Sequence, residues 1–293
     1  MQFISHAIFV AFYFGNAVDA FGYIPSKDAV PLHVISRMPH NYLHRSSLPN
    51  EFDWKSLNGT VYVTRVGNQL QPKPCGSCWA HGATGALSDR FKIAMKASVP
   101  DINLSPQVLL NCGPVEKFGS CSGGDHVAAY KFIYENGITD ETCVPYESVD
   151  QTNWAEIPCK DRMCRTCDIH GNCYFIKGIK YEISEYGTVT GEDQMMAEIY
   201  ARGPIACLMY AHTSAFQNYT GGIIDDSDHY NNSITHVVAV TGWGTDEQSG
   251  LPFWSVRNSF GTHWGEVGWF KLRRGTNCLN IESHVCSWAV PKL

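Results

Sequence analysis

Several features that identify common classes of protein are missing from this sequence. It has no block or stripe of basic residues, and 28 acidic against 22 basic residues give a net charge of −6, so we do not expect nucleic acid as a partner. No internal repeat is visible, which argues against a solenoid or a propeller. No apolar run is long enough to span a bilayer, so we expect no membrane span. What remains is a globular chain of 293 residues, long enough for two modest domains or one large one.

The N-terminus lacks basic residues but otherwise resembles a targeting segment. An apolar run from Phe3 to Phe14 is followed by small residues, with cleavage positions after Ala17 or Ala20. This pattern predicts a secretory signal peptide over residues 1–20. The alternative is a membrane anchor, but the run is shorter than the roughly 20 residues that a spanning helix needs.

No cysteine precedes Cys75, yet the chain contains twelve. That density is typical of an oxidising compartment, and four N-glycosylation sequons agree with it. Asn103 precedes a predicted helix start, where it would be buried, so we expect glycosylation at Asn58, Asn218 and Asn231. The sequence therefore predicts a lysosomal or secreted protein.

Residues 21–47 contain no cysteine and show little regular pattern. They are polar, contain proline and show no strong periodicity, whereas a patterned region begins at Leu48. We interpret residues 21–47 as a short propeptide. The alternative is a disordered N-terminal tail of the mature protein.

The patterned region divides into a helical part at about 64–173 and a β-rich part at about 174–293. Spacing of apolar residues predicts helices over 77–95, from Ser105 and over 125–135, and five cysteines within 143–173 predict a loop held by disulfides. Branched and aromatic runs predict strands at 174–181, 236–243, 252–257 and 268–272, interrupted by a helix over 193–201. A helical half followed by a β half predicts an α+β fold with a cleft between the halves.

The run Cys75-Gly76-Ser77-Cys78 opens the first predicted helix. Unpaired backbone N–H groups in the first turn favour negative charge, so a thiol at Cys78 is biased toward the nucleophilic thiolate. A bare pair of cysteines at this spacing is also compatible with a redox pair, a zinc half-site or two structural cysteines. Redox chemistry would require a thioredoxin-like βαβ context, which the sequence does not supply. Zinc would require a second pair, and Cys164 and Cys167 have that spacing.

A cysteine nucleophile requires a base, and the β-rich part contains one candidate with its partner. His236 opens an apolar strand, and Asn258 follows the next strand. The Asn258 side-chain oxygen is suited to accept the imidazole N–H, shielded by the aromatic rings of Phe260 and Trp264. The alternative for His236 is a buried core histidine. An oxyanion donor is expected just upstream of Cys78, at Gln69 or Gln71.

Together these residues resemble the papain-like cysteine peptidases, over residues 48–293. The resemblance implies a two-domain fold with a helical left domain, a β-barrel-like right domain and the active-site cleft between them. It implies that Cys78 is the nucleophile, His236 the base and acid, Asn258 the orienting residue and Gln69 the oxyanion donor. No metal or organic cofactor is implied. The expected partners of this monomer are peptide and protein substrates, with its own propeptide as inhibitor.

The resemblance also assigns two segments to substrate binding. Gly123 and Gly124 look like the family's glycine stretch, where the backbone pairs with an extended substrate; the alternative is an ordinary turn. The insertion from Gln71 to Lys73 looks like the mini-loop of the cathepsin X branch, also called cathepsin Z, and Trp264 lies near the expected cleft. That branch acts mainly as a carboxypeptidase, because the mini-loop shortens the cleft on the leaving-group side.

Three departures from this branch affect the expected activity. The branch has a histidine, thought to hold the substrate carboxylate, where this chain has Leu70, and Lys73 is the nearby cation that could replace it. The branch's propeptide carries a cysteine that this one lacks, so inhibition is expected to be non-covalent. Phe260 replaces a tryptophan. The alternatives are therefore an endopeptidase or mixed specificity, and, less favoured, a non-catalytic binding protein.

The branch's pattern also implies a disulfide pairing, with Cys278 left as a free thiol. The implied pairs are Cys75–Cys121, Cys112–Cys159, Cys143–Cys164, Cys167–Cys173 and Cys207–Cys286.

Overall fold

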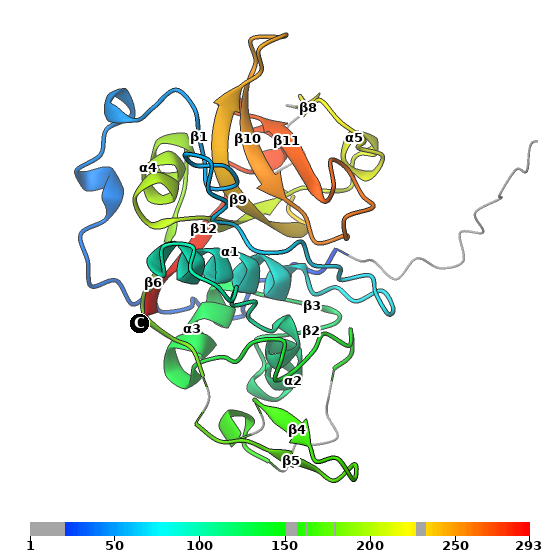
Figure 1. The fold of residues 1–293 in the computed structure, drawn as a ribbon. Coiled ribbons are helices and arrows are strands. Elements are labelled where there is room, and N and C mark those ends of the chain that lie inside the picture. The colour runs from blue at the N-terminus through cyan, green and yellow to red at the C-terminus, as the bar shows by residue number, and fades with distance from the viewer. Residues whose placement is uncertain (1–20, 151–156, 162, 179, 227–232) are drawn as a thin grey trace, which may run out of the picture.

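The computed structural model describes residues 21–293 except 151–156, 162, 179 and 227–232. The predicted signal peptide and the sequon at Asn231 lie outside the described residues. A helical half and a β-rich half meet along the first helix, α1 (Cys78–Ala94), and Figure 1 shows this helix crossing the middle of the molecule. The α+β architecture expected from the sequence is confirmed.

The helical half contains α1, α2 (Pro106–Glu116) and α3 (His126–Asn136). The predicted helix starts are confirmed by their caps. The Ser105 hydroxyl accepts a hydrogen bond from the backbone of Val108, and the Asp125 carboxylate accepts from Val127 and Ala128. A short ribbon of β2 (Gly119–Ser120) and β3 (Gly123–Gly124) joins α2 to α3.

The β-rich half is built on one eight-stranded sheet with the order β6-β12-β7-β9-β10-β11-β8, and with β1 added beside β9. Its pairings are antiparallel except for β11 with β8. The strands are β1 (Phe52–Asp53), β6 (Glu182–Val189), β7 (Ile205–Met209), β8 (Ile223–Ile224), β9 (His236–Thr245), β10 (Pro252–Arg257), β11 (Trp269–Arg273) and β12 (Cys286–Lys292). Helices α4 (Glu192–Arg202) and α5 (Ser214–Gln217) complete this half.

One predicted strand is wrong in position. Residues 174–181 do not form a long strand; β5 (Cys173–Phe175) pairs instead with β4 (Arg165–Cys167) in a small hairpin at the lower end of Figure 1. The long strand begins only at Glu182. It was not recognised because β6 carries charged residues, and one of them, Glu185, is buried against residues 35 and 36 rather than exposed.

Five disulfides bridge the described cysteines, and they are the pairs that the resemblance implied: Cys75–Cys121, Cys112–Cys159, Cys143–Cys164, Cys167–Cys173 and Cys207–Cys286. Two cysteines are free and buried, Cys78 and Cys278. The cysteine-rich loop predicted over 143–173 is thus tied to itself and to α2.

Helix α1 is held to the β-rich half by two buried ion pairs, one to the end of β10 and one to α4. Asp89 accepts hydrogen bonds from the Arg257 guanidinium at the end of β10, at 2.8 and 3.1 Å. Arg90, fully buried, donates to Glu198 in α4 at 2.9 Å. Because breaking a buried pair leaves an uncompensated charge, these contacts fix α1 firmly against the strands.

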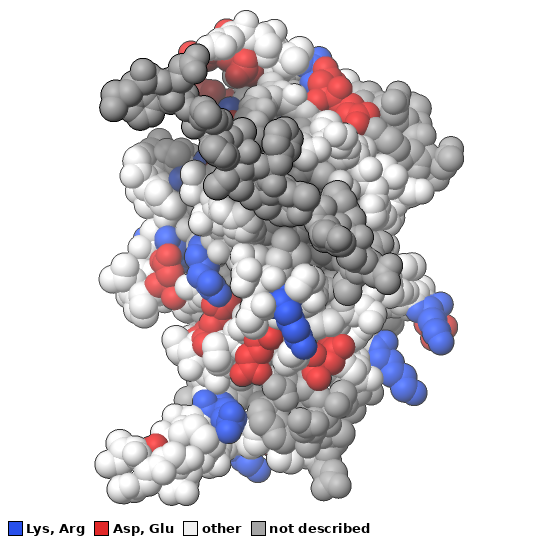
Figure 2. Space-filling view, turned by 90° about the vertical axis from the view of Figure 1, so that its right-hand side faces the viewer, with Lys and Arg blue, Asp and Glu red and all other residues white. Residues whose placement is uncertain are grey.

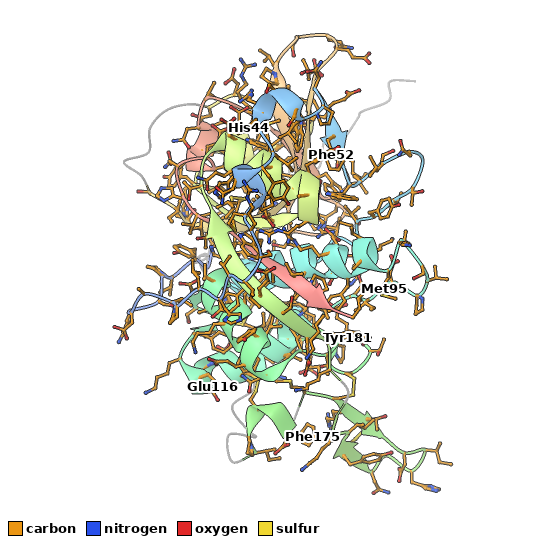
Figure 3. The ribbon with its side chains drawn as sticks, turned by 90° about the vertical axis from the view of Figure 1, so that its left-hand side faces the viewer. His44, Phe52, Met95, Glu116, Phe175 and Tyr181 are labelled. Carbon is orange, nitrogen blue, oxygen red and sulfur yellow. A yellow bond between two sulfur atoms is a disulfide. The ribbon has the colours of Figure 1, made fainter. Side chains whose placement is uncertain are left out.

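Residues 21–47 follow the outside of both halves. They run from the junction of the halves past β6, where His33 and Tyr186 exchange backbone hydrogen bonds, to η1 (Pro39–Asn41) and η2 (Arg45–Ser47) near α4. Figure 3 shows this segment beside β6 and then at the β-rich end, where His44 and Phe52 are labelled. The remaining short helices are η3 (Cys159–Asp161) and η4 (Cys278–Asn280).

The described residues bear on surface charge, membrane spanning and metal binding. On the face drawn in Figure 2, acidic and basic side chains are interspersed. Within the described residues, every helix is too short or too polar to cross a bilayer, and no group of three or more His, Cys, Asp or Glu is placed to hold a metal ion. Asn58 and Asn218 are exposed, whereas Asn103 is half-buried.

Candidate active site

Cys78 is the first residue of α1, as the sequence predicted. The turn before it is fixed by the Cys75–Cys121 disulfide and by a hydrogen bond from the Gly76 N–H to the Cys121 carbonyl at 2.7 Å. Cys78 is fully buried. Backbone groups of Gly22, Val237 and Trp79 hydrogen-bond to its sulfur, so the thiol lies against the start of β9 and against residues 21–47.

His236 and Asn258 are brought together by the neighbouring strands β9 and β10. His236 Nε2 lies 2.8 Å from Asn258 Oδ1, and the Ser259 N–H donates to the same oxygen at 2.8 Å. The Phe260 ring lies 5.2 Å from the imidazole, and Trp264 packs on Phe260. His236 Nδ1 is buried without a hydrogen-bond partner among the described residues. The Cys78 sulfur contacts the backbone of Val237, so the thiol lies against the start of the strand that carries His236.

Burial shifts the pKa of both Cys78 and His236 toward the neutral form. Burial raises the pKa of Cys78 to about 11, against the lowering by backbone hydrogen bonds. Burial also lowers the pKa of His236 to about 4, although the hydrogen bond with Asn258 raises it. Burial therefore opposes the bias toward thiolate that was predicted for a helix N-terminus, and that bias stays a prediction.

Gln69 is buried between the two segments that carry the other candidates. Its side-chain oxygen accepts from the Ser259 hydroxyl at 2.6 Å, and its amide donates to the Cys75 carbonyl at 3.1 Å. The other candidate donor, Gln71, is exposed in the loop that follows. The amide of Gln69 is thus fixed between the turn before Cys78 and the residue after Asn258.

The glycine pair of β3 is hydrogen-bonded to an extended segment of the chain itself, and substrate binding at Gly123 and Gly124 stays a prediction. The Gly124 N–H donates to the Gly22 carbonyl at 2.9 Å, and the Ile24 N–H donates to the Gly124 carbonyl at 3.1 Å, in parallel pairing. A Cβ at Gly123 would lie 2.7 Å from the Ile24 side chain, and one at Gly124 would lie 2.6 Å from the Trp79 ring. Glycine is needed here for the backbones to approach.

The ring of Phe21, the residue before Gly22, packs among aromatic rings beside His236. Its ring centroid lies 4.6 Å from that of His212, 5.4 Å from His236 and 6.0 Å from Phe260. Residues 21–24 therefore cover the thiol and the imidazole together. Sequence reasoning missed Phe21 and His212, because neither belongs to a motif and their contacts join segments almost 200 residues apart.

The loop after Gln69 contains the two residues that bear on carboxylate binding. Leu70 is half-buried, and its N–H donates to Asn68 Oδ1 at 3.0 Å. Lys73 is exposed; its N–H donates to the Ser148 hydroxyl at 3.1 Å, and its charge acts on Asp150, whose pKa burial nevertheless raises. The cation predicted to hold a substrate carboxylate thus lies in the field of a carboxylate of the protein.

Comparisons with known proteins agree with this geometry. Residues 48–289 match the family described as papain family cysteine protease. A cathepsin Z of Onchocerca volvulus is 41% identical over 252 residues, which are 83% of this chain and 78% of that protein. A cathepsin C of Schistosoma mansoni is 32% identical over 81% of this chain, which spans 50% of the length of that protein.

Solved structures that are similar to this chain include proforms of cathepsins. A digestive procathepsin L2 from the larval midgut of Tenebrio molitor has 29% sequence identity and a TM-score of 0.71, and the match covers 94% of this chain and 79% of that chain. A buried cysteine opens α1 at the junction of the two halves, a buried histidine and asparagine are hydrogen-bonded at the ends of β9 and β10, and the family match covers most of the sequence. The chain belongs to the papain family of cysteine proteases and is a cathepsin Z-like cysteine peptidase.

Proposed function

We propose that Cys78 is the nucleophile and His236 the base and acid of peptide hydrolysis. His236 takes the proton of the Cys78 thiol, the sulfur adds to the carbonyl carbon of the scissile bond, and as the bond to the amine breaks His236 gives that proton to the leaving amine. Water then loses a proton to His236 and adds to the thioester, which releases the acid and the thiol. The hydrogen bond of 2.8 Å from His236 to Asn258 supports an orienting role for Asn258.

Gln69 is the proposed oxyanion donor, together with the backbone N–H of Cys78. Its position beside the turn of Cys75 supports this role, and the hydrogen bond from Ser259 holds its oxygen so that the amide nitrogen faces the nucleophile's turn. The Gly123–Gly124 segment would pair with the part of the substrate before the scissile bond, in the place of residues 22–24, and Trp264 would wall the cleft beyond Phe260.

The specificity that we propose is that of a carboxypeptidase. One observation supports it: the base of the loop from Leu70 to Pro74 is attached to the residues that follow Asn258, from which we infer that the loop lies on the leaving-group side of the thiol. Asn68, at its base, forms a backbone bridge with Phe260, whose ring contacts Phe21. A loop at that place leaves room for a short leaving group, and the likeness to the cathepsin Z branch agrees with this reading.

Loss of the carboxylate-binding histidine at Leu70 favours a second candidate, an endopeptidase or an enzyme of mixed specificity. Matched peptides with a free or an amidated C-terminus distinguish the two. A carboxypeptidase cleaves the free acid far faster. Lys73→Ala should then raise KM for the free acid more than for the amide. If Lys73 makes a charge-assisted hydrogen bond with the carboxylate, the loss in kcat/KM for the free acid should correspond to about 1–3 kcal/mol. Equal cleavage of both peptides would replace the proposal with the endopeptidase.

Residues 21–47 are proposed to be the inhibitory propeptide, and residues 48–293 the catalytic unit. Coverage of Cys78 and His236 by Phe21 and Gly22 supports this, and so does a second attachment at β6. There the Glu185 carboxylate accepts the N–H groups of Ile35 and Ser36 at 2.8 and 2.9 Å, and Arg202 donates to the Ser36 hydroxyl at 2.9 Å. Inhibition is non-covalent, because residue 22 is glycine. We place the enzyme in lysosomal or extracellular proteolysis, in agreement with the disulfides and with the exposed sequons at Asn58 and Asn218.

A further inference from the structure

A small cavity lies where α1 meets β9 and the end of β10. Its volume, measured as the space open to the centres of water molecules, is about 40 Å³. That is room for about two or three waters, at roughly 10–15 Å³ each. Asn258 and Ser259 line the cavity from one side and Gly82 and Thr84 in α1 from another, and all four residues are buried. The cavity therefore reaches the residue that we propose to orient His236.

The charges that line this cavity are compensated by the protein. Arg65 forms an ion pair with Glu141, and its exposed side chain places this pair at the outer end of the cavity. At the inner end, Arg257 is paired with Asp89. Because both guanidinium groups of the lining already have a carboxylate partner, an anion in the cavity would be a buried charge without a counter-charge. The charges therefore favour water as the ligand.

Two buried nitrogen atoms of the lining residues, Asn258 Nδ2 and His81 Nε2, have no hydrogen-bond partner among the described residues. Asn258 is 2% exposed, and its oxygen is already used, since it lies 2.8 Å from His236 Nε2 and accepts from the Ser259 N–H. A buried N–H without an acceptor is costly, and ordered water commonly satisfies such groups. The nitrogen of Asn258 therefore requires an acceptor from the cavity.

His81 is held in place to provide the other end of such a contact. Its ring packs edge-on against Tyr146 with centroids 4.6 Å apart, and the Tyr146 hydroxyl lies 2.7 Å from Ser77 Oγ. On another side the ring is so near Gly67 that a Cβ there would lie 2.6 Å from Nδ1. Burial, with a smaller effect of the Arg65 charge, lowers the pKa of His81 to about 3. The ring is therefore neutral near pH 7, and a neutral imidazole has one nitrogen that accepts a hydrogen bond.

We propose that a bound water in this cavity joins Asn258 to His81, and that His81 is thereby a positioning residue for the catalytic pair. The water accepts from the side-chain N–H of Asn258 and donates to His81 Nε2. This contact holds the oxygen of Asn258 toward His236, so that the imidazole is fixed for proton transfer. The inference rests on the proposed role of Asn258 in peptide hydrolysis.

The first test is a double-mutant cycle in the full chain activated by removal of residues 21–47. His81→Phe keeps a ring but removes both nitrogens. We expect kcat to fall about 10-fold with little change in KM, because a misplaced base slows the chemical step without weakening substrate binding. In the Asn258→Ala background the same change should have little effect, since His81 then has no asparagine to position.

Two conservative variants and a control complete the kinetic test. His81→Gln, whose amide reaches the position of Nε2, should recover most of kcat, whereas His81→Asn, which reaches only the position of Nδ1, should not. His170→Phe makes the same change at an exposed histidine between β4 and β5 and should alter neither kcat nor KM. Failure of Gln to do better than Asn would overturn the contact at Nε2.

A crystal structure of the Cys78→Ser full chain tests the water directly. We expect density for a water within hydrogen-bond distance of both Asn258 Nδ2 and His81 Nε2, and loss of that density in His81→Phe. Bromide in the crystallisation solution has an anomalous signal that identifies a bound anion. Such a signal between these two nitrogens, or a direct contact between the side chains without water, would overturn the proposal.

The outcomes separate this inference from the proposed function. Unchanged kcat in Asn258→Ala would refute the orienting role of Asn258 and, with it, the role of His81. A loss in Asn258→Ala without a loss in His81→Phe would refute the positioning role of His81 alone. Equal losses from His81→Phe in the wild-type and Asn258→Ala backgrounds would do the same, because His81 would then act independently of Asn258.

Discussion

At Cys78 two opposing effects on acidity meet. The helix N-terminus favours the thiolate, and backbone hydrogen bonds, one of them from Gly22, lower the pKa of the thiol, whereas burial raises it and outweighs those hydrogen bonds. Cys78→Ser keeps nearly the same shape but removes the thiol, and a hydroxyl is not ionised by this environment. We expect turnover below 1% of the wild-type value, measured with a fluorogenic peptide, with an unchanged far-UV and near-UV circular dichroism spectrum. Substantial activity in this variant would exclude Cys78 as the nucleophile.

We expect substitutions of His236 and of Asn258 to lower kcat to different extents. His236→Ala removes the proton carrier, so we expect kcat to fall about as far as in Cys78→Ser. Asn258→Ala removes only the group that orients the ring at 2.8 Å, so we expect a smaller loss, about 10- to 100-fold, a range typical of the loss of supporting groups. Steady-state kinetics of both variants over pH 4–8 check this order. An Asn258 variant as inactive as the His236 variant would contradict it.

The candidate catalytic residues were predictable because each carries a local signal. Cys78 opens a helix after a short cysteine motif. His236 and Asn258 lie at the ends of buried strands whose branched and aromatic residues are evident in the sequence. Phe21 and His212 were not predictable, because their meaning comes from contacts with each other and with His236. The burial that opposes ionisation of Cys78 was not predictable for a related reason, because residues that cover it, such as Gly22, lie far away in the sequence.

At the scale of elements, the ion pair between Asp89 in α1 and Arg257 at the end of β10 holds Cys78 and Asn258 in register. Asp89→Asn leaves the Arg257 charge buried and uncompensated, so we expect unfolding free energy to fall by about 3–5 kcal/mol. Chemical denaturation of the full chain measures this. Glu135→Gln, which removes the exposed pair with Lys131 in α3, is the matched control and should cost less than about 1 kcal/mol. A similar small effect for Asp89→Asn would show that the buried pair does not fix α1.

A second prediction concerns the attachment of residues 35 and 36 to β6. Burial raises the pKa of Glu185, but hydrogen bonds from Ser36 and Ile35 outweigh it, and the pKa lies below its ordinary value. Its contribution is therefore present above the ordinary pKa and is lost only as pH falls through the lowered one. Glu185→Gln should loosen residues 31–38 and speed activation of the full chain at pH 5.5, followed by gel electrophoresis. An unchanged activation rate would mean that this attachment does not restrain the segment.

The sequence predicted the helices that have capping residues and the strands that have an apolar pattern. It did not predict strands whose formation depends on pairing with distant segments. Capped helices and the apolar strands β9 and β10 were placed within a residue or two. Strands β6, β7 and β12 were missed or displaced. β6 is charged because it binds residues 31–36, and β12 ends in Pro291 and Lys292. Their pairing is decided by partners far away in the sequence, which a local pattern does not encode.

At the scale of the whole molecule, the covering of His236 makes inhibition sensitive to acid. In the covered state the pKa of His236 is lowered to about 4, and an uncovered imidazole is expected nearer its ordinary value of 6.5. As pH falls from 7 through 6.5 toward 4, only the uncovered state takes up the proton, so acid favours uncovering. The effect reaches at most about 3 kcal/mol, at 1.36 kcal/mol per pKa unit.

Hydrogen exchange of the backbone N–H groups of residues 22–24 checks this in the Cys78→Ser full chain, which cannot process itself. After correction for intrinsic rates, protection should fall between pH 7 and pH 4.5, and His236→Gln should flatten the change. Protection that is constant with pH, or equally pH-dependent in the His236→Gln variant, would assign the acid response to other groups.

The claim that residues 21–47 hold a reactive catalytic pair in its neutral state is tested most directly by the alkylation rate of Cys78. We would measure that rate with iodoacetamide against pH, by mass spectrometry of the Cys78 peptide, before and after removal of the segment. In the uncleaved chain we expect negligible alkylation below pH 8, because the thiol is buried and its pKa is about 11. After cleavage the rate at pH 5–6 should rise by at least about 100-fold, since the uncovered thiol is ionised beside His236. Equal rates before and after cleavage would show that residues 21–47 do not control the reactivity of Cys78.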